Sequence, residues 1–151
     1  MRDETSIGAP ERLSTLAQWQ LSKASTLGAR LTGAHMPLGG RSDFAVLAAL
    51  DEYGSLSQAE LGRRLGLDRN DVSGIVNRLE AADQVRREPY AGDRRRNVIS
   101  ITANGALHFA GLRRIADAVQ DELLRGLSPD ERRQLGSLLA KVLDSHAPQP
   151  A

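Results

Sequence analysis

The sequence predicts a mainly α-helical chain with one small two-stranded β-hairpin and long helices at both ends. Three observations predict this class. Apolar residues recur at helical spacing along most of the chain, two neighbouring stretches alternate polar with apolar residues, and typical helix-start and helix-end residues separate the segments. With 151 residues and 40% hydrophobic content, the chain can form one domain with an apolar core.

The composition excludes several kinds of site. The chain has no cysteine and only three histidines, which excludes disulfides and thiol chemistry and leaves little for a metal site. We therefore expect no metal and no cofactor. The chain has no apolar run long enough to cross a membrane and no secretory signal at its N-terminus, so we expect a cytoplasmic protein without a membrane partner. Residues 1–9 and 147–151 are expected to be flexible.

The first two helices follow from spacing and from end signals. Leucines and alanines recur at helical spacing after Pro10, which predicts one long helix over residues 10–34. A second helix is expected from an N-cap at Ser42 to Glu52, where Tyr53 and Gly54 end it.

The next segment predicts a helix-turn-helix. Ser57 and Glu60 form a capping-box pattern that begins a short helix, and Gly66 ends that helix. After a tight turn, Asp68 can cap a second helix whose apolar residues, from Val72 onward, follow the i, i+3, i+4, i+7 pattern. Two helices joined by a short glycine-containing turn form a helix-turn-helix.

The polar face of that second helix differs from an ordinary surface helix, because it carries short or forked hydrogen-bonding groups instead of Lys and Glu pairs. A merely solvated face would be the better interpretation of this helix alone, but its neighbours favour contact with base edges and phosphates. Gly74 would let the backbone approach DNA closely, and Asp71 would accept from cytosine N4 or pair with Arg69 or Arg78. The DNA-binding candidates here are Ser57, Gln58, Arg69, Asn70, Asp71, Ser73, Gly74, Asn77 and Arg78.

A β-hairpin, or wing, is predicted directly after the helix-turn-helix. Residues 84–90 and 97–102 alternate polar with apolar side chains, and residues 91–93 form the turn between them. No glycine follows the preceding helix, so Asp83 or Gln84 must accommodate the turn into the wing. As an isolated run, the charged tip would be a solvated turn, whereas its position favours a negatively charged partner. The wing's DNA-binding candidates are Asp93, Arg94, Arg95 and Arg96.

Two more helices complete the chain. Thr102 caps the first, which Gly126 ends, and Ser128 with Pro129 begins the second. The terminal helices carry more apolar surface than a small winged domain covers, so we expect a homodimer with dimerisation helices over residues 10–35 and 104–146. The DNA-binding domain is expected over residues 42–102. The residues expected at the dimer interface are Leu13, Leu16, Leu112, Ile115, Leu135, Leu138, Leu139 and Val142.

These elements in this order, with the stretch GDRRRNVISITANG at 92–105, resemble the MarR family of winged helix-turn-helix transcription regulators. Asp93, Arg95, Thr102 and Gly105 match the family's wing motif, with Ile101 where the family has Leu. The resemblance implies a mainly α fold with a two-stranded wing and flanking dimerisation helices. It also implies a homodimer that binds a pseudo-palindromic operator in double-stranded DNA through two recognition helices in successive major grooves. By the same resemblance, Arg95 would enter the minor groove and Asp93 would orient it.

The family resemblance also implies a repressor that a small-molecule effector, aromatic or anionic, releases from DNA. The effector pocket would lie between the dimerisation helices and the winged domain. Trp19 and Phe44 are more often plain core residues, and His35 near a helix end is more often a satisfied or exposed histidine. The candidates for this pocket are Trp19, His35, Met36, Arg41 and Phe44.

The same sequence features allow other functions. A ligand-independent DNA-binding or architectural dimer stays open, as does a protein-interaction module that uses the same helices. An enzyme is not expected, because the sequence carries no nucleophile with its base, no paired carboxylates on one face, no phosphate loop and no metal-ligand spacing.

Overall fold

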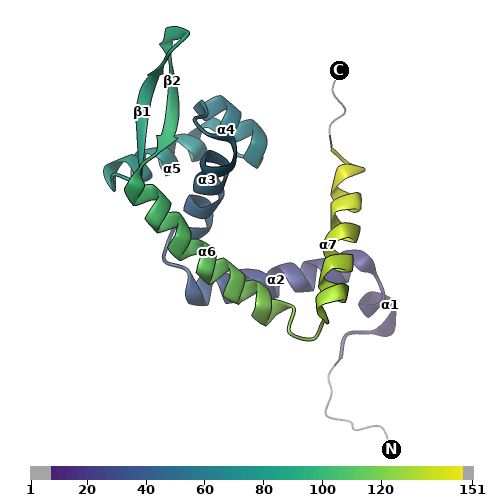
Figure 1. Cartoon of the computed structure of the whole chain (residues 1–151). Coiled ribbons are helices and arrows are strands. Elements are labelled where there is room, and N and C mark those ends of the chain that lie inside the picture. The colour runs from purple at the N-terminus through teal and green to yellow at the C-terminus, as the bar shows by residue number, and fades with distance from the viewer. Residues whose placement is uncertain (1–7, 148–151) are drawn as a thin grey trace, which may run out of the picture.

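The computed structural model of the chain describes residues 8–147 and contains seven helices and a two-stranded antiparallel sheet (Figure 1). The predicted fold class is confirmed. The elements in chain order are α1 (Glu11–Ser14), α2 (Ala17–His35), α3 (Gly40–Tyr53), α4 (Gln58–Leu65), α5 (Arg69–Ala81), β1 (Val85–Tyr90), β2 (Asp93–Ile101), α6 (Ala103–Leu123) and α7 (Pro129–Asp144). The expected flexible ends, 1–9 and 147–151, lie almost entirely outside the described residues.

A compact unit of α3, α4, α5 and the hairpin contains most of the core, and α6 runs from it toward α2 and α7 (Figure 1). Its interior is aliphatic, and the rings of Phe44 and Phe109 join α3 to α6 at its edge with centroids 5.5 Å apart. The core residues are Val46, Leu47, Ala49, Leu50, Leu56, Leu61, Val72, Ile75, Val76, Leu79, Val85, Ile99 and Leu112.

Side-chain caps set four of the helix starts where the sequence predicts them. Ser57 and Ser128 each form a complete capping box with the glutamate three residues later. Asp68 accepts from the Asp71 amide at 2.8 Å, and Thr102 accepts from the Gly105 amide at 3.0 Å. These caps satisfy amides that the first helical turn leaves without partners, so polar residues fix the boundaries.

Three helix boundaries differ from the sequence prediction. The first helix is broken, because the chain leaves helical geometry at Leu16, which is extended (φ −76°, ψ 125°). Ser42 is not an N-cap: α3 begins two residues earlier behind left-handed Gly39, and the Ser42 hydroxyl donates to the Gly39 carbonyl. The helix α6 ends at Leu123, before Gly126, so that glycine does not cap it.

The hairpin pairs β1 with β2 from Val85 opposite Ile101 to Tyr90 opposite Asp93, with a register irregularity at Pro89 and Tyr90. The second strand begins earlier than predicted, at Asp93. Its first residues, through Asn97, are exposed on both faces, so no apolar alternation marks them in the sequence. Leu56 adds a short bridge to Ile99, which the sequence does not reveal.

The turn into the wing depends on Asp83, which adopts the left-handed conformation (φ 56°). The sequence predicts that Asp83 or Gln84 makes this turn, and the residue is Asp83. Aspartate tolerates this conformation better than most residues with a Cβ. The Thr102 hydroxyl donates to the Asp83 carbonyl at 2.6 Å, and the Asn104 amide donates to its carboxylate at 3.1 Å. The start of α6 therefore holds this turn in place.

The terminal helices leave apolar surface uncovered. Helix α2 packs along α6, whereas α7 stands away from the compact unit and has no buried residue (Figure 1). Leu16, Leu138 and Val142 are about half exposed. Leu112 differs from the sequence expectation: it is 2% exposed and belongs to the core of its own chain, which leaves almost none of its surface for a second chain. Among residues 8–147, no helix combines the length and apolarity needed to cross a membrane.

Candidate nucleic-acid interface

Helix α5 presents one polar face to solvent because its opposite face is anchored in the core. Val72, Ile75, Val76 and Leu79 are all buried. The i, i+3, i+4, i+7 spacing of these four residues places the remaining side chains outward. The apolar stripe of α5 therefore determines which residues can face a partner.

The N-terminal half of α5 is the most open part of this face. Arg69, Asn70 and Asp71 are exposed, and Ser73 is half-buried. A Cβ added at Gly74 would meet nothing within 4 Å. Within the described residues, no hydrogen bond or ion pair occupies the side chains of Arg69 and Asn70. Both are therefore available to an external partner.

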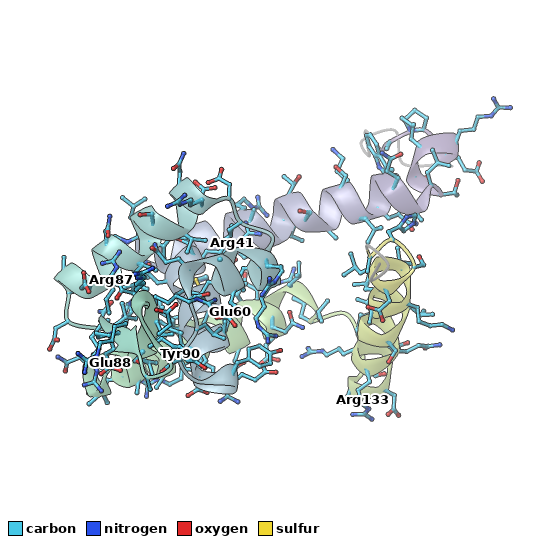
Figure 2. All side chains as sticks on the ribbon, turned by 90° about the horizontal axis from the view of Figure 1, so that it is seen from above. Arg41, Glu60, Arg87, Glu88, Tyr90 and Arg133 are labelled. Carbon is cyan, nitrogen blue, oxygen red and sulfur yellow. The ribbon has the colours of Figure 1, made fainter. Side chains whose placement is uncertain are left out.

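The C-terminal half of α5 is occupied by contacts within the chain. Asn77 accepts a hydrogen bond from Arg87 of β1 at 2.6 Å, and Arg87 also pairs with Glu80. The Arg87 backbone amide donates to Glu80 at 3.2 Å as well. Figure 2 shows Arg87, Glu88 and Tyr90 together on the compact unit, whereas Arg133 lies on α7. Arg87 therefore fastens the wing to α5.

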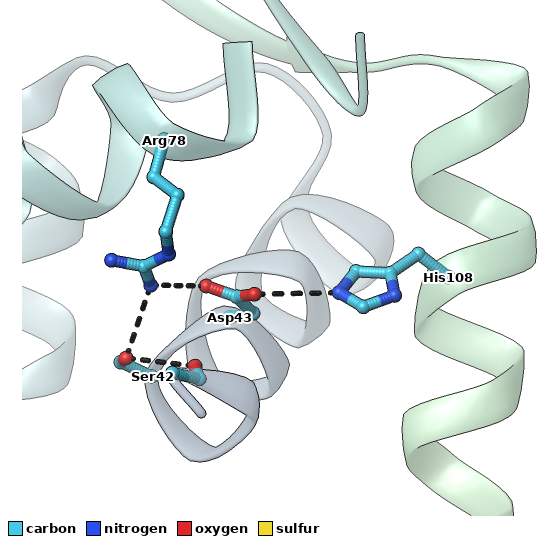
Figure 3. Close-up of polar contacts among 5 residues, drawn as sticks. Ser42, Asp43, Arg78 and His108 are labelled. Carbon is cyan, nitrogen blue, oxygen red and sulfur yellow. Dashed lines mark hydrogen bonds and ion pairs between the residues drawn. The ribbon is translucent and has the colours of Figure 1, made fainter. Parts of the chain in front are cut away.

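Arg78, one turn from the C-terminus of α5, points toward α3 and not away from the chain (Figure 3). It donates to Asp43, which is 7% exposed, and to the Ser42 hydroxyl at 3.4 Å. The second Asp43 oxygen lies 3.3 Å from Nε2 of His108 on α6. These residues, Ser42, Asp43, Arg78 and His108, form the Asp43 cluster, which joins α3, α5 and α6.

The start of α4 is the second predicted contact region. The Ser57 hydroxyl and amide both donate to Glu60 at 2.8 Å, and the hydroxyl accepts from the Glu60 amide. The two Ser57 donors, first the amide and then the hydroxyl, hold the pKa of Glu60 below its ordinary value of 4.5. The Gln58 side-chain nitrogen is buried without a hydrogen-bond partner among the described residues. The Ser57 contacts within the chain therefore all belong to the helix cap of α4.

The wing tip carries the arginines that the sequence singles out. Asp93, Arg94, Arg95 and Arg96 are exposed at the start of β2. Asp93 accepts from the Arg95 backbone amide at 3.0 Å, so it fixes the backbone of Arg95. Arg96 lines a pocket of about 350 Å³ with Glu60 and Tyr90, between the wing and α4. The wing thus presents Arg94 and Arg95 most freely.

A larger cavity of about 670 Å³ lies between α2, α3, α6 and α7. Met36, Arg41 and Phe44, three of the predicted effector residues, line it among mostly apolar side chains. Trp19 and His35 are not among the lining residues. The Lys23 ammonium lies 4.5 Å from the centre of the Trp19 ring, and His35 lies 3.5 Å from Glu122 of α6.

Three residues that form contacts in this region are not predicted from the sequence: Asp43, Arg87 and His108. Asp43 precedes Leu47 by four residues and Leu50 by seven, which places an acid on the buried face of α3. That spacing is a signal that could have identified it. Arg87 gives no such signal, because its partners come from a different element.

Comparison with known proteins identifies related chains. A family model described as MarR family matches residues 40–96. The transcriptional repressor NicR of Pseudomonas putida is 34% identical over 102 residues, which cover 68% of this chain and 65% of NicR. The chain spans 62–65% of the length of this and two other curated relatives.

Solved structures share the fold. A probable transcriptional regulator from Pseudomonas aeruginosa is 27% identical with a TM-score of 0.75, covering 87% of this chain and 99% of that one. BpsR of Bordetella bronchiseptica, whose DNA binding is regulated by 6-hydroxynicotinic acid, is 24% identical with a TM-score of 0.72. That alignment covers 82% of this chain and 95% of BpsR.

Proposed function

The chain belongs to the MarR family, and from this premise we propose that it is a sequence-specific DNA-binding transcriptional regulator that acts as a repressor. One observation carries the proposal. The outer face of α5 offers Arg69, Asn70 and the open backbone at Gly74, while its inner face is fixed in the core. A rigidly held helix with free, forked hydrogen-bonding groups suits the major groove.

The remaining contacts follow from the same geometry. Arg69 and Asn70 reach base edges from the first turn of α5, and the wing reaches the adjacent minor groove with Arg95. A narrow minor groove concentrates negative potential, which attracts a guanidinium. Asp93 supports this role because its carboxylate fixes the Arg95 backbone. Arg94 lies on the phosphate backbone.

We also propose that the chain forms a homodimer, whose two-fold symmetry implies a pseudo-palindromic operator. Uncovered apolar residues in and next to α1, α2 and α7 support the homodimer, among them Leu13, Leu16, Leu138 and Val142. An uncovered apolar patch on a monomer usually marks an interface. Two-fold symmetry then places the two recognition helices about 34 Å apart, in successive major grooves.

A small ligand, aromatic or anionic, releases the repressor by filling the 670 Å³ cavity. Apolar walls with two guanidiniums, those of Arg41 and Arg132, suit such a molecule. The regulation of BpsR by 6-hydroxynicotinic acid supports this ligand class. The ligand shifts the population toward dimers with misplaced recognition helices, by no more than its differential affinity for the two states.

The test is selection of an operator from random duplexes, followed by titration of the selected duplex and a matched scrambled duplex. We expect specific affinity in the nanomolar range with a steep salt dependence. Arg95→Ala should weaken binding and lower the salt slope, whereas Arg133→Ala on α7 is the charge-matched control. Equal binding of both duplexes would contradict sequence-specific regulation. Selective binding that no aromatic acid weakens would instead favour the ligand-independent dimer.

A further inference from the structure

We propose that Asp43 is a positioning residue for DNA recognition, which holds Arg78 inward and thereby fixes the angle of α5 against α3 and α6. The inference rests on the proposed DNA-binding function. It also reassigns Arg78, which the sequence places among the DNA contacts, to an internal role.

The position of Asp43 between two helices supports this role. Asp43 lies in the first turn of α3, and each of its two oxygens faces a different helix (Figure 3). One oxygen accepts from Arg78 of α5, and the other lies 3.3 Å from His108 of α6. A single carboxylate therefore connects the proposed recognition helix to the long helix that leaves the winged unit.

The burial of the Asp43 carboxylate requires a paired charge. The Asp43 side chain is only 10% exposed, and a carboxylate at such a depth is stable only when it is paired and hydrogen-bonded. The Arg78 side chain is 47% exposed and could reach solvent without Asp43. The burial of Asp43 is therefore what draws Arg78 inward.

The loop before α3 leaves space for the Arg78 guanidinium. Gly39 precedes α3 in the left-handed conformation (φ 79°), and a Cβ there would lie 3.1 Å from the central carbon of the Arg78 guanidinium. A side chain at Gly39 would thus crowd the ion pair. The loop before α3 leaves room where Arg78 passes.

The consequence concerns the direction of α5. Its apolar stripe fixes which face is buried but allows small rotations and tilts, since aliphatic contacts are not directional. The ion pair between Asp43 and Arg78, near the C-terminus of α5, fixes the orientation of the helix. When the pair is lost, α5 tilts and Arg69 and Asn70 at the far end are displaced. A freed Arg78 would also add a phosphate contact that carries no sequence information.

The experiment uses the full chain and the selected operator, with affinity measured over a range of salt concentrations. The variants are Asp43→Asn, Arg78→Gln, the double variant and Arg78→Lys, and Asp51→Asn on the exposed side of α3 is the control. We expect each of the first two to weaken binding about tenfold and the double variant to be no weaker, because the two residues act as one unit. Asp51→Asn should bind like the parent.

The salt slope separates positioning from direct contact. Arg78→Gln should leave the slope unchanged, and Asp43→Asn should make it steeper as Arg78 turns to the phosphates. Arg78→Lys should recover most of the affinity by restoring the charge opposite Asp43. A slope reduced by about one in Arg78→Gln, or losses that multiply in the double variant, would overturn the proposal.

The experiment distinguishes failure of the proposed DNA-binding function from failure of the positioning role of Asp43. If the parent protein selects no operator, the proposed function fails before any variant is tested. If Asp43→Asn does not fold, the Arg78→Gln and Arg78→Lys pair decides the question, because Arg78 is half exposed. A Lys variant that binds no better than the Gln variant then contradicts the ion-pair role.

Discussion

Replacing Gly105 with alanine places a methyl group against the backbone at the junction of the wing and α6. An added Cβ would lie 1.9 Å from the Gln84 carbonyl oxygen and 2.8 Å from Cγ1 of Ile101. Real Cβ atoms essentially never approach a neighbour closer than 3.0 Å, so the Gln84 carbonyl must move by at least about 1 Å. That carbonyl accepts from the Thr102 amide at 3.1 Å, and the shift breaks this bond.

One stabilising and two destabilising contributions determine the change in the free energy of unfolding. Alanine in place of glycine inside a helix stabilises by about 1 kcal/mol. Overpacking costs about 1–3 kcal/mol, and a lost backbone hydrogen bond costs about 1 kcal/mol more. The net loss is therefore about 1–3 kcal/mol, despite the gain in helix propensity. For a chain of this size it lowers the melting temperature by roughly 2–12 °C.

The assay is thermal unfolding at fixed protein concentration, with Gly74→Ala as the matched control. Gly74 is also inside a helix, but an added Cβ meets nothing within 4 Å there. Only the propensity gain remains, and we expect Gly74→Ala to stabilise by about 0.5–1 kcal/mol. A Gly105→Ala variant that melts at or above the parent temperature would refute the steric reasoning.

Three other outcomes are expected. Ser57→Ala should destabilise by about 1 kcal/mol at neutral pH. Folding lowers the pKa of Glu60, so the Ser57–Glu60 contact contributes its full stability above the unfolded pKa of 4.5 and loses it as the pH falls through the lower folded pKa. The destabilisation by Ser57→Ala, measured by denaturant unfolding, should therefore shrink in acid. A destabilisation that stays constant with pH would contradict this. Leu138→Glu should convert the proposed dimer to a monomer in sedimentation at micromolar concentration, and an unchanged species would remove α7 from the interface. Arg87→Ala should speed amide exchange in the wing but not in α2, and equal protection would show that Arg87 does not fasten it.

Most of the fold could be predicted from the sequence because its boundaries depend on local chemistry. Ser57, Asp68, Thr102 and Ser128 cap helices through residues within three positions, and such signals are readable along the chain. The break at Leu16 is not readable in this way, since no proline or glycine marks it. A periodic apolar pattern continues across it.

The candidate site was less predictable because its polar contacts join distant elements. The exposed face of α5 follows from its apolar stripe, yet nothing local to Arg78 reveals that Asp43, 35 positions away, turns it inward. Leu112 shows that the partner of an apolar residue is equally hard to predict when it lies on a distant element. Its helical position matches that of an interface leucine, and only the packing of α6 against α3 assigns it to the core.

The left-handed turn at Asp83 has a mechanical consequence. Its carbonyl and carboxylate are both held by the start of α6, and Arg87 fastens the following strand to α5. The wing therefore cannot swing like a flap while the recognition helix stays still. In the proposed dimer, a rotation of α6 therefore moves α5 and the wing together. A small rotation at the far end of α6 becomes a larger displacement of Arg69 and Arg95.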